Sequence, residues 1–266
     1  MSHASKCRPL KSSFDWRFNF SAMAFRIMAT LRYTRSGISP VVVNSELTKK
    51  ICDKPIENQN GDRVFVGANL SVSIIAPRAT DLARLQDFDA IHTGRSSHVD
   101  AWLPHFSKAT KVSYDFATVH DAKRIAQVAP HCFLLAFSGG SLSRHEALSL
   151  AGLAHAHGAT WSLVTRGQEG ALLFGPHGFH EEPAQAVEAI DTLGAGDTFI
   201  AYVLVGLLEE RQSGDVLSGA AQAAAKTCLM RGAFGHGAPM AIDLSNMMSL
   251  EEIYRITKPA AVPAEA

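Results

Sequence analysis

Residues 191–201 read Asp-Thr-Leu-Gly-Ala-Gly-Asp-Thr-Phe-Ile-Ala, a loop of small residues that leads directly into an apolar stretch. Gly194, Ala195 and Gly196 have almost no side-chain bulk, so their backbone N–H groups can approach an anion closely. At the start of a helix these groups lack partners and the helix dipole favours negative charge. The stretch therefore predicts a phosphate-binding loop at a helix N-terminus.

Asp197 falls in the first turn of that predicted helix. The field of the helix start favours its ionised form, and an ionised carboxylate there can accept a proton from an attacking hydroxyl. A Gly-x-Gly-Asp string taken alone is also compatible with a simple helix-capping role. Taken by themselves, these four residues leave both interpretations open.

A second glycine-bounded turn lies upstream, where Thr165, Gly167 and Gly170 separate two short apolar runs. This arrangement predicts a hairpin between residues 161–164 and 171–174. From residue 63 onward the chain alternates strand-like and helix-like segments, which favours an α/β fold with a largely parallel sheet. The predicted strands are 90–93, 111–116, 132–137 and 159–165, and the predicted helices are 78–86, 120–128, 145–157, 197–211 and 215–231.

The whole string 191–201 resembles the second signature of the ribokinase-like (pfkB) carbohydrate kinases, and the resemblance extends from about Gly61 to about Gly237. It implies a ribokinase-like fold with a mostly parallel central sheet flanked by helices. It also implies ATP and Mg²⁺ as cofactors, with Asp197 as the catalytic base and residues 194–196 stabilising the transferring phosphoryl group. Tyr202 departs from the family pattern, which usually has glycine there.

Three further assignments follow from the resemblance alone. Thr165, Gly167 and Gly170 match a turn that contacts nucleotide phosphates, and Asp191 with Thr192 lies on the nucleotide side of the signature. Glu146 falls where the family has an Asn-x-x-Glu motif that organises magnesium and its waters, although the asparagine is absent here. A solvated glutamate in the first turn of a helix is the alternative for Glu146.

Within this family the sequence is most similar to the fructoselysine 6-kinases, as residues 60–65, 91–94 and 114–116 indicate. The resemblance implies a sugar or sugar-amine substrate, with Arg63, His92 and Asp115 as candidate contacts. His92 and Asp115 follow strand-like runs, where α/β sheets place ligands, but each also fits an ordinary structural role. Kinases of the family that act on other sugars or on nucleosides, and a catalytically impaired nucleotide-binding homologue, are the alternatives.

The first sixty residues resemble the family least. Residues 23–25, Met-Ala-Phe, stand in place of the Gly-Gly-Asn motif that grips the sugar, and residues 31–40 resemble the helix-to-strand passage that follows it. Residues 1–50 carry nine basic residues but only Asp15 and Glu46 as acids. We expect a divergent segment with a partial lid at 1–60, a kinase core at 61–250 and a tail at 251–266.

Composition narrows the classes of partner. The 266 residues contain 25 Lys plus Arg and 25 Asp plus Glu, so no net field favours nucleic acid or an anionic membrane. The longest apolar run, 199–208, is about half of what a bilayer span requires. Four widely spaced cysteines without metal-ligand spacing suggest a reducing compartment, and we expect a cytoplasmic protein; a homodimer is compatible with the sequence.

Overall fold

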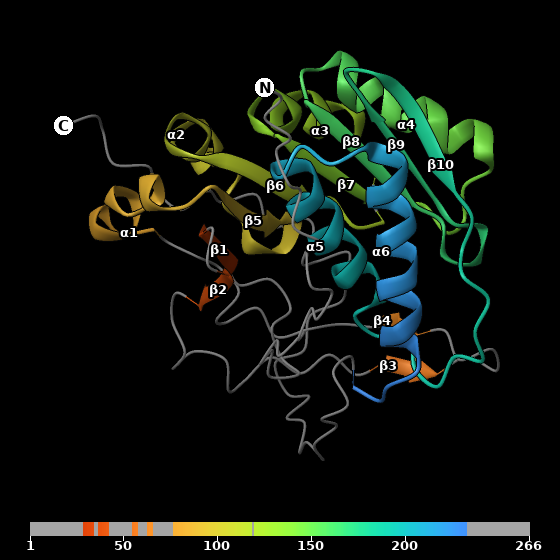
Figure 1. The fold of residues 1–266 in the computed structure, drawn as a ribbon. Helices are drawn as coiled ribbons and strands as arrows, with labels where there is room; N and C mark the ends of the chain where they lie inside the picture. Colours follow the sequence, from red (N-terminus) through yellow and green to blue (C-terminus); the bar gives the residue numbers. More distant parts are fainter. Residues whose placement is uncertain are drawn as a thin grey trace, which may run out of the picture.

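The computed structural model describes residues 29–34, 37–42, 55–57, 63–65, 77–118 and 120–232, and before residue 77 it describes only the backbone of four strands (Figure 1). Those strands are β1 Ala29–Thr34, β2 Gly37–Val42, β3 Pro55–Glu57 and β4 Arg63–Phe65. The remaining strands are β5 Ala90–Gly94, β6 Lys111–Asp115, β7 Leu134–Ser138, β8 Trp161–Thr165, β9 Ala171–Gly175 and β10 Gly178–Glu182. The helices are α1 Ala79–Ala83, α2 Leu103–Ala109, α3 Ala122–Val128, α4 Arg144–Ala156, α5 Ala195–Leu208 and α6 Ser213–Cys228.

Eight of the described strands form one sheet in the order β10-β9-β8-β7-β6-β5-β1-β2. The four central strands β5 to β8 are parallel, and β9 and β10 continue the sheet as antiparallel strands. β3 and β4 form a separate two-stranded antiparallel sheet. The chain therefore has a mixed sheet with a parallel centre, which confirms the predicted α/β class.

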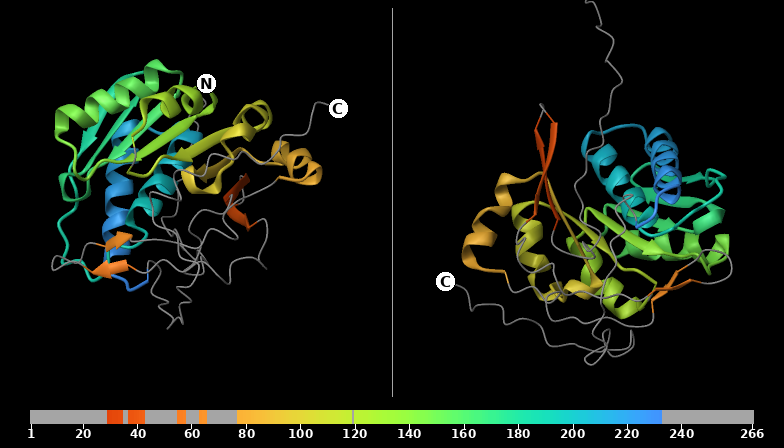
Figure 2. Two further views of the ribbon diagram at one scale, coloured as in Figure 1. Left: turned by 180° about the vertical axis from the view of Figure 1, so that it is seen from behind. Right: turned by 90° about the horizontal axis from the view of Figure 1, so that it is seen from below.

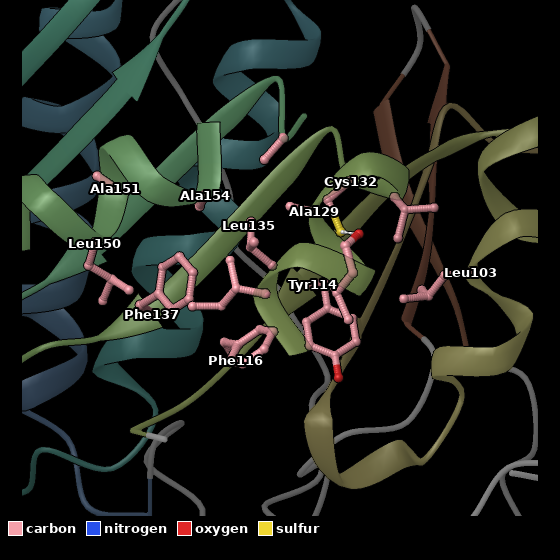
Figure 3. Close-up of a cluster of buried hydrophobic side chains, with 14 of the residues drawn as sticks. Leu103, Tyr114, Phe116, Ala129, Cys132, Leu135, Phe137, Leu150, Ala151 and Ala154 are labelled. Carbon is pink, nitrogen blue, oxygen red and sulfur yellow. Dashed lines mark hydrogen bonds between the residues drawn. The ribbon is translucent and has the colours of Figure 1, made fainter. Parts of the chain in front are cut away.

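Helices cover both faces of the sheet, so the central strands are buried on both sides (Figure 2). One face, with α2, α3 and α4, contains aromatic residues such as Tyr114, Phe116 and Phe137 (Figure 3). The other face packs against α5, whose Phe199 and Val203 are buried. This explains why β7 reads as a continuous apolar run, because strands covered on both faces need no polar alternation.

Local sequence signals account for the best-predicted elements. α4 begins at Ser143, whose hydroxyl accepts a hydrogen bond from the backbone N–H of Glu146, while the Glu146 carboxylate accepts one from the backbone N–H of Ser143. This reciprocal capping box is the sequence pattern Ser-x-x-Glu realised in space. α5 is apolar on nearly all sides because it lies between the sheet and α6.

The structure confirms the four predicted parallel strands, the hairpin of β8 and β9, and the five predicted helices to within a few residues, although 78–86 divides into α1 and a short 3-10 turn, Leu85–Asp87. Two elements had no prediction: α2, and β10, which pairs with β9 through the turn at 176–177. The helix expected at the beginning of residues 31–40 is wrong, because β1 and β2 pair there as antiparallel strands. Residues 23–25 and the tail 251–266 lie outside the described residues.

Candidate active site

The parallel strands end together at one edge of the sheet. In the strand register Gly94 pairs with Asp115, Asp115 with Ala136, and Ser138 with Thr165. The candidate substrate residue Asp115 and the candidate nucleotide residue Thr165 thus lie at the same carboxyl edge, two strands apart. This is the edge at which open α/β sheets bind their ligands.

The small-residue loop has the geometry expected of an anion-binding helix start. Gly194 adopts the left-handed conformation, with φ of 79°, and α5 begins at the next residue. A side chain would be strained at Gly194 whatever the surrounding space, so glycine is required there. Asp197 lies exposed in the first turn of α5, and a Cβ atom added to Gly196 would meet nothing within 4 Å. Gly196 and Asp197 are thus the exposed residues at the start of α5.

Asp191 holds the base of the loop. Its side chain is buried, 5% exposed, and its two carboxylate oxygens accept hydrogen bonds from the backbone N–H groups of Leu193 (2.9 Å) and Gly232 (2.8 Å). Its own N–H donates to the carbonyl of Cys228 at the end of α6. Beside it, the carbonyl of Thr192 accepts from the N–H of Ala195. Asp191 therefore fixes the start of the loop before α5 to the chain that leaves α6.

The turn after β8 contains two glycines with different roles. Gly167, with φ of 57°, faces open space, whereas a Cβ on Gly170, with φ of 85°, would collide with the carbonyl oxygen of Glu182 and lie 2.8 Å from Cα of Pro183. Gly170 is thus needed where the end of β10 crosses the turn. Thr165 donates its hydroxyl to the carbonyl of Phe137 on β7 at 3.3 Å. Figure 1 shows the connection, in teal, that runs on from β10 to the start of α5.

The candidate substrate residues are only partly brought together. His92 lies within β5, and its Nδ1 is 2.9 Å from the hydroxyl oxygen of Ser113 on β6. Asp115 ends β6, and its Oδ1 accepts a hydrogen bond from the N–H of Ala117, a residue with positive φ. Arg63 belongs to β4, in the separate small sheet, and its side chain lies outside the described residues.

Glu146 serves the helix start rather than a visible metal cluster. It is exposed in the capping box of α4, and its hydrogen bonds with the side chain and backbone of Ser143 lower the pKa of its carboxyl group. Among the described residues, no group of three or more His, Cys, Asp or Glu side chains is arranged to hold a metal ion. Nothing in this geometry assigns Glu146 to magnesium, and that role stays a proposal.

Tyr202 changes the packing behind the loop. Its ring lies against Gly219 of α6, where an added Cβ would overlap the ring and hydroxyl of Tyr202. Nη1 of Arg211 donates to the Tyr202 hydroxyl at 3.4 Å, and the guanidinium lies 5.1 Å from the ring centroid. The large side chain on α5 is thus accommodated by the absence of one on α6.

The pfkB family carbohydrate kinase model matches residues 105–237, and the chain belongs to this family. The match covers the described core from α2 to the end of α6 and includes the candidate nucleotide loop, Glu146 and Asp115. The predicted family membership is confirmed.

Among its relatives, the chain is similar to the fructosamine kinase FrlD of Bacillus subtilis (strain 168), with 35% identity over 190 residues, 70% of this chain and 67% of that protein. It is also similar to the fructoselysine 6-kinase of Shigella flexneri, with 30% identity over 67% of this chain and 69% of that protein. A ribokinase of Arabidopsis thaliana, solved with ribose and ATP, has 19% identity and a TM-score of 0.51, covering 74% and 65% of the two chains. This last likeness shows the ribokinase-like fold alone.

Sequence reasoning missed a cluster at the same edge of the sheet, formed by Asp100, Tyr114 and Arg124. In the sequence Tyr114 stands out only as part of a family-like string. Asp100 and Arg124 carry no signal, because polar residues in loops and first helical turns are common. Only the folded register shows that they meet.

Proposed function

We propose that this chain is an ATP-dependent kinase that transfers the γ-phosphoryl group of MgATP to a hydroxyl group of a sugar or sugar amine, most specifically the 6-hydroxyl of a fructosamine such as fructoselysine. The observation that carries the proposal is the start of α5, where Gly194 turns the chain and Gly196 and Asp197 face open surface. The relatives named as fructosamine and fructoselysine kinases support the substrate class.

Each residue of the site has a role in that reaction. Asp197 accepts the proton of the attacking hydroxyl, while the N–H groups of Gly194 and Gly196 stabilise negative charge on the transferring phosphoryl group. The N–H of Ala195 is already bonded to the carbonyl of Thr192 and helps to shape the loop. The new bond forms between the sugar oxygen and the γ-phosphorus, and the bond to the β–γ bridging oxygen breaks, releasing ADP. Mg²⁺, when bound with the nucleotide, would neutralise part of the charge on the phosphates.

Two surfaces support the reactants in this proposal. The turn of Thr165, Gly167 and Gly170 flanks the nucleotide phosphates, with Asp191 and Thr192 fixing the loop from below. Asp115 lies on the other half of the edge, and His92 lies within β5, two residues before that edge; the sugar would bind on this side. Glu146 at the start of α4 would organise magnesium-bound water in this proposal. Phosphoryl transfer depends chiefly on holding the two reactants in line, so separate halves of one edge suit it.

Calorimetric titrations with MgATP and with fructoselysine, each alone, test the proposal together with detection of phosphorylated product. We expect measurable binding of MgATP but weaker binding of the sugar. The reason is that residues 23–25, Met-Ala-Phe, have neither the two glycines nor the asparagine amide of the Gly-Gly-Asn motif. ATP binding without phosphorylation of any sugar tried would identify a catalytically impaired homologue. Phosphorylation of ribose or a nucleoside in preference to the fructosamine would identify another substrate. No binding of either ligand would contradict the proposal.

Two further points concern the membrane and the class of partner. Within the described part of the chain, none of the helices has the length and apolarity needed to span a bilayer. The family acts on small carbohydrates, consistent with the expected small-molecule partner. We propose a cytoplasmic location, which fractionation of the source cells would test.

A further inference from the structure

Asp100, Tyr114 and Arg124 form a closed polar triangle beside the carboxyl ends of β5 and β6. Nε of Arg124 lies 2.6 Å from Oδ2 of Asp100, and Nη2 donates to the Tyr114 hydroxyl at 3.1 Å. The Tyr114 hydroxyl in turn donates to Oδ1 of Asp100 at 2.8 Å. Burial and the nearby Asp100 carboxylate raise the pKa of Tyr114 well above its ordinary value, so this hydroxyl stays a donor.

Arg124 also reaches the turn that follows β5. Its Nη2 lies 3.4 Å from the carbonyl oxygen of Arg95, the first residue of a short 3-10 turn, Arg95–Ser97. The guanidinium groups of Arg95 and Arg124 lie 5.8 and 5.9 Å from the centroid of the Phe116 ring, whose position in the core is shown in Figure 3. Cation–π contact with one ring brings both arginines to the same place.

The turn held in this way lies against the candidate substrate residue. A Cβ on Gly94 would be 3.0 Å from the carbonyl oxygen of Asp115, so the end of β5 has no slack relative to the end of β6. Asp100 thus contacts Arg124, which donates to the carbonyl of Arg95. The preceding residue, Gly94, lies against Asp115. None of these three polar residues, Asp100, Tyr114 or Arg124, takes part in the phosphoryl transfer proposed above.

We propose that Arg124 is a positioning residue that fixes the backbone after β5 and thereby sets the sugar-binding half of the edge. This inference rests on the proposed function for its catalytic consequence. Arg124 acts through the Arg95 carbonyl rather than by touching substrate or nucleotide, so its loss should weaken use of the sugar more than use of ATP. The ion pair and hydrogen bonds of Arg124 described above go to Asp100, Tyr114 and Arg95, so the nucleotide half at Thr165 and the start of α5 should be spared.

Two variants separate positioning from simple stability. Arg124→Met leaves the Asp100 carboxylate without its ion pair, which destabilises the fold on its own account. The double variant Asp100→Asn with Arg124→Met removes both charges but still lacks the donor to the Arg95 carbonyl. A structural role predicts that the double variant recovers both melting temperature and sugar KM, whereas positioning predicts recovery of melting temperature alone. Lys123→Met, at an exposed position next along α3, is the matched control.

Amide hydrogen exchange of the full-length chain reports on the turn at residues 94–98 without requiring any kinase activity. In the double variant we expect exchange in residues 94–98 to rise about five- to tenfold, the equivalent of one lost hydrogen bond, with residues 165–170 unchanged. With an active enzyme, sugar KM should rise about two- to tenfold while ATP KM stays within about twofold. Unchanged exchange at 94–98 would overturn the proposal. Absence of any kinase activity in the unaltered chain would refute the proposed function, while the exchange experiment would still decide whether Arg124 fixes the turn.

Discussion

The carboxylate of Asp191 accepts a hydrogen bond from the backbone N–H of Gly232, 41 positions further along the chain. With the second bond from Leu193, this contact joins the loop before α5 to the end of α6. An amide at position 191 cannot accept both bonds through two oxygens, because one of its terminal atoms is a donor. The proposed phosphate loop therefore depends on a residue that need not touch phosphate.

Asp191→Asn should lower the melting temperature and raise the KM for ATP together. The lost bond to a buried carboxylate is worth about 1–3 kcal/mol, and the loop that it anchors carries the N–H groups that we propose to bind phosphate. Thermal melting and steady-state kinetics measure the two effects. Asp121→Asn, at the exposed N-cap of α3, provides the control because asparagine caps helices about as well as aspartate. An altered KM without any loss of stability would point to direct nucleotide contact instead.

Asp197→Asn should lower the rate of phosphoryl transfer by about 10²- to 10⁴-fold while ATP affinity changes only several-fold. The substitution removes the proton acceptor but leaves the N–H groups of the loop in place. Rapid-mix or steady-state rates and ATP titration give the two numbers. Asp215→Asn, in the first turn of α6, should keep full activity. Retention of most activity in Asp197→Asn would exclude it as the base.

Gly196→Val should reduce use of ATP more than it reduces stability. The added side chain meets no protein atom at Cβ, so the fold tolerates it, but it stands where a phosphate would approach. Gly214→Val is a matched control, because Gly214 also lies in a first helical turn with open space around it. Equal loss of ATP use in both variants would contradict a phosphate site at α5.

Gly170→Ala should destabilise the protein more than Gly167→Ala. Both positions have positive φ, but only at Gly170 does the new Cβ also strike the chain leaving β10. At Gly167 the positive φ costs an alanine about 1–2 kcal/mol. Gly170, with φ of 85° and ψ of −142°, lies in a backbone region that is essentially restricted to glycine, and the collision adds to that strain. Denaturant unfolding measures the difference. Equal destabilisation would show that the chain near Glu182 can move aside.

Glu146→Gln separates the two roles left open for this residue. Glutamine preserves the capping box but removes the charge. The lowered pKa of Glu146 means that its ionised form stabilises the fold above the ordinary glutamate pKa of about 4.3, and that this contribution is lost as pH falls through the lower folded pKa. In Glu146→Gln, the free energy of unfolding should therefore lack the part that wild-type protein loses as the pH falls through this range, as denaturant unfolding at several pH values would measure.

The magnesium role makes a separate prediction for the same variant. If Glu146 organises magnesium-bound water, the Mg²⁺ concentration for half-maximal activity should rise in Glu146→Gln. The requirement should stay unchanged in Glu181→Gln, which removes an exposed carboxylate paired with Arg144. An unchanged Mg²⁺ requirement in Glu146→Gln would leave Glu146 with the capping role alone.

Much of the fold could be predicted because its signals are local. The apolar run of β7 and the Ser-x-x-Glu cap of α4 each specify their element within a few residues. β10 escaped prediction because Phe179 and His180 stand among polar residues at the edge of the sheet, where pairing with β9 rather than burial forms the strand. α2 escaped because Pro104 and a polar outer face conceal a one-sided apolar pattern, with Leu103 and Phe106 buried.

The candidate site was predictable only in part. The glycines and Asp197 are contiguous and carry their chemistry in a short string. Two hydrogen bonds of the site join residues far apart in the chain: Asp191 with Gly232, 41 positions apart, and Arg124 with the Arg95 carbonyl, 29 positions apart. No local sequence pattern predicts either contact. The sequence alone indicates which side chains could bind a ligand or take part in catalysis. The tertiary structure shows which of these side chains instead form hydrogen bonds that hold the loops in place.

The contact of Tyr202 with Gly219 makes two positions on different helices interdependent. A methyl group at 219 collides with the tyrosine ring, and glycine at 202 would leave the ring's space unfilled behind the phosphate loop. Each change is harmful alone, yet a small residue at 202 would open room for a larger one at 219. Replacing Tyr202 by the glycine common in the family should therefore be combined with a larger residue at position 219. Either replacement alone should give a less stable protein.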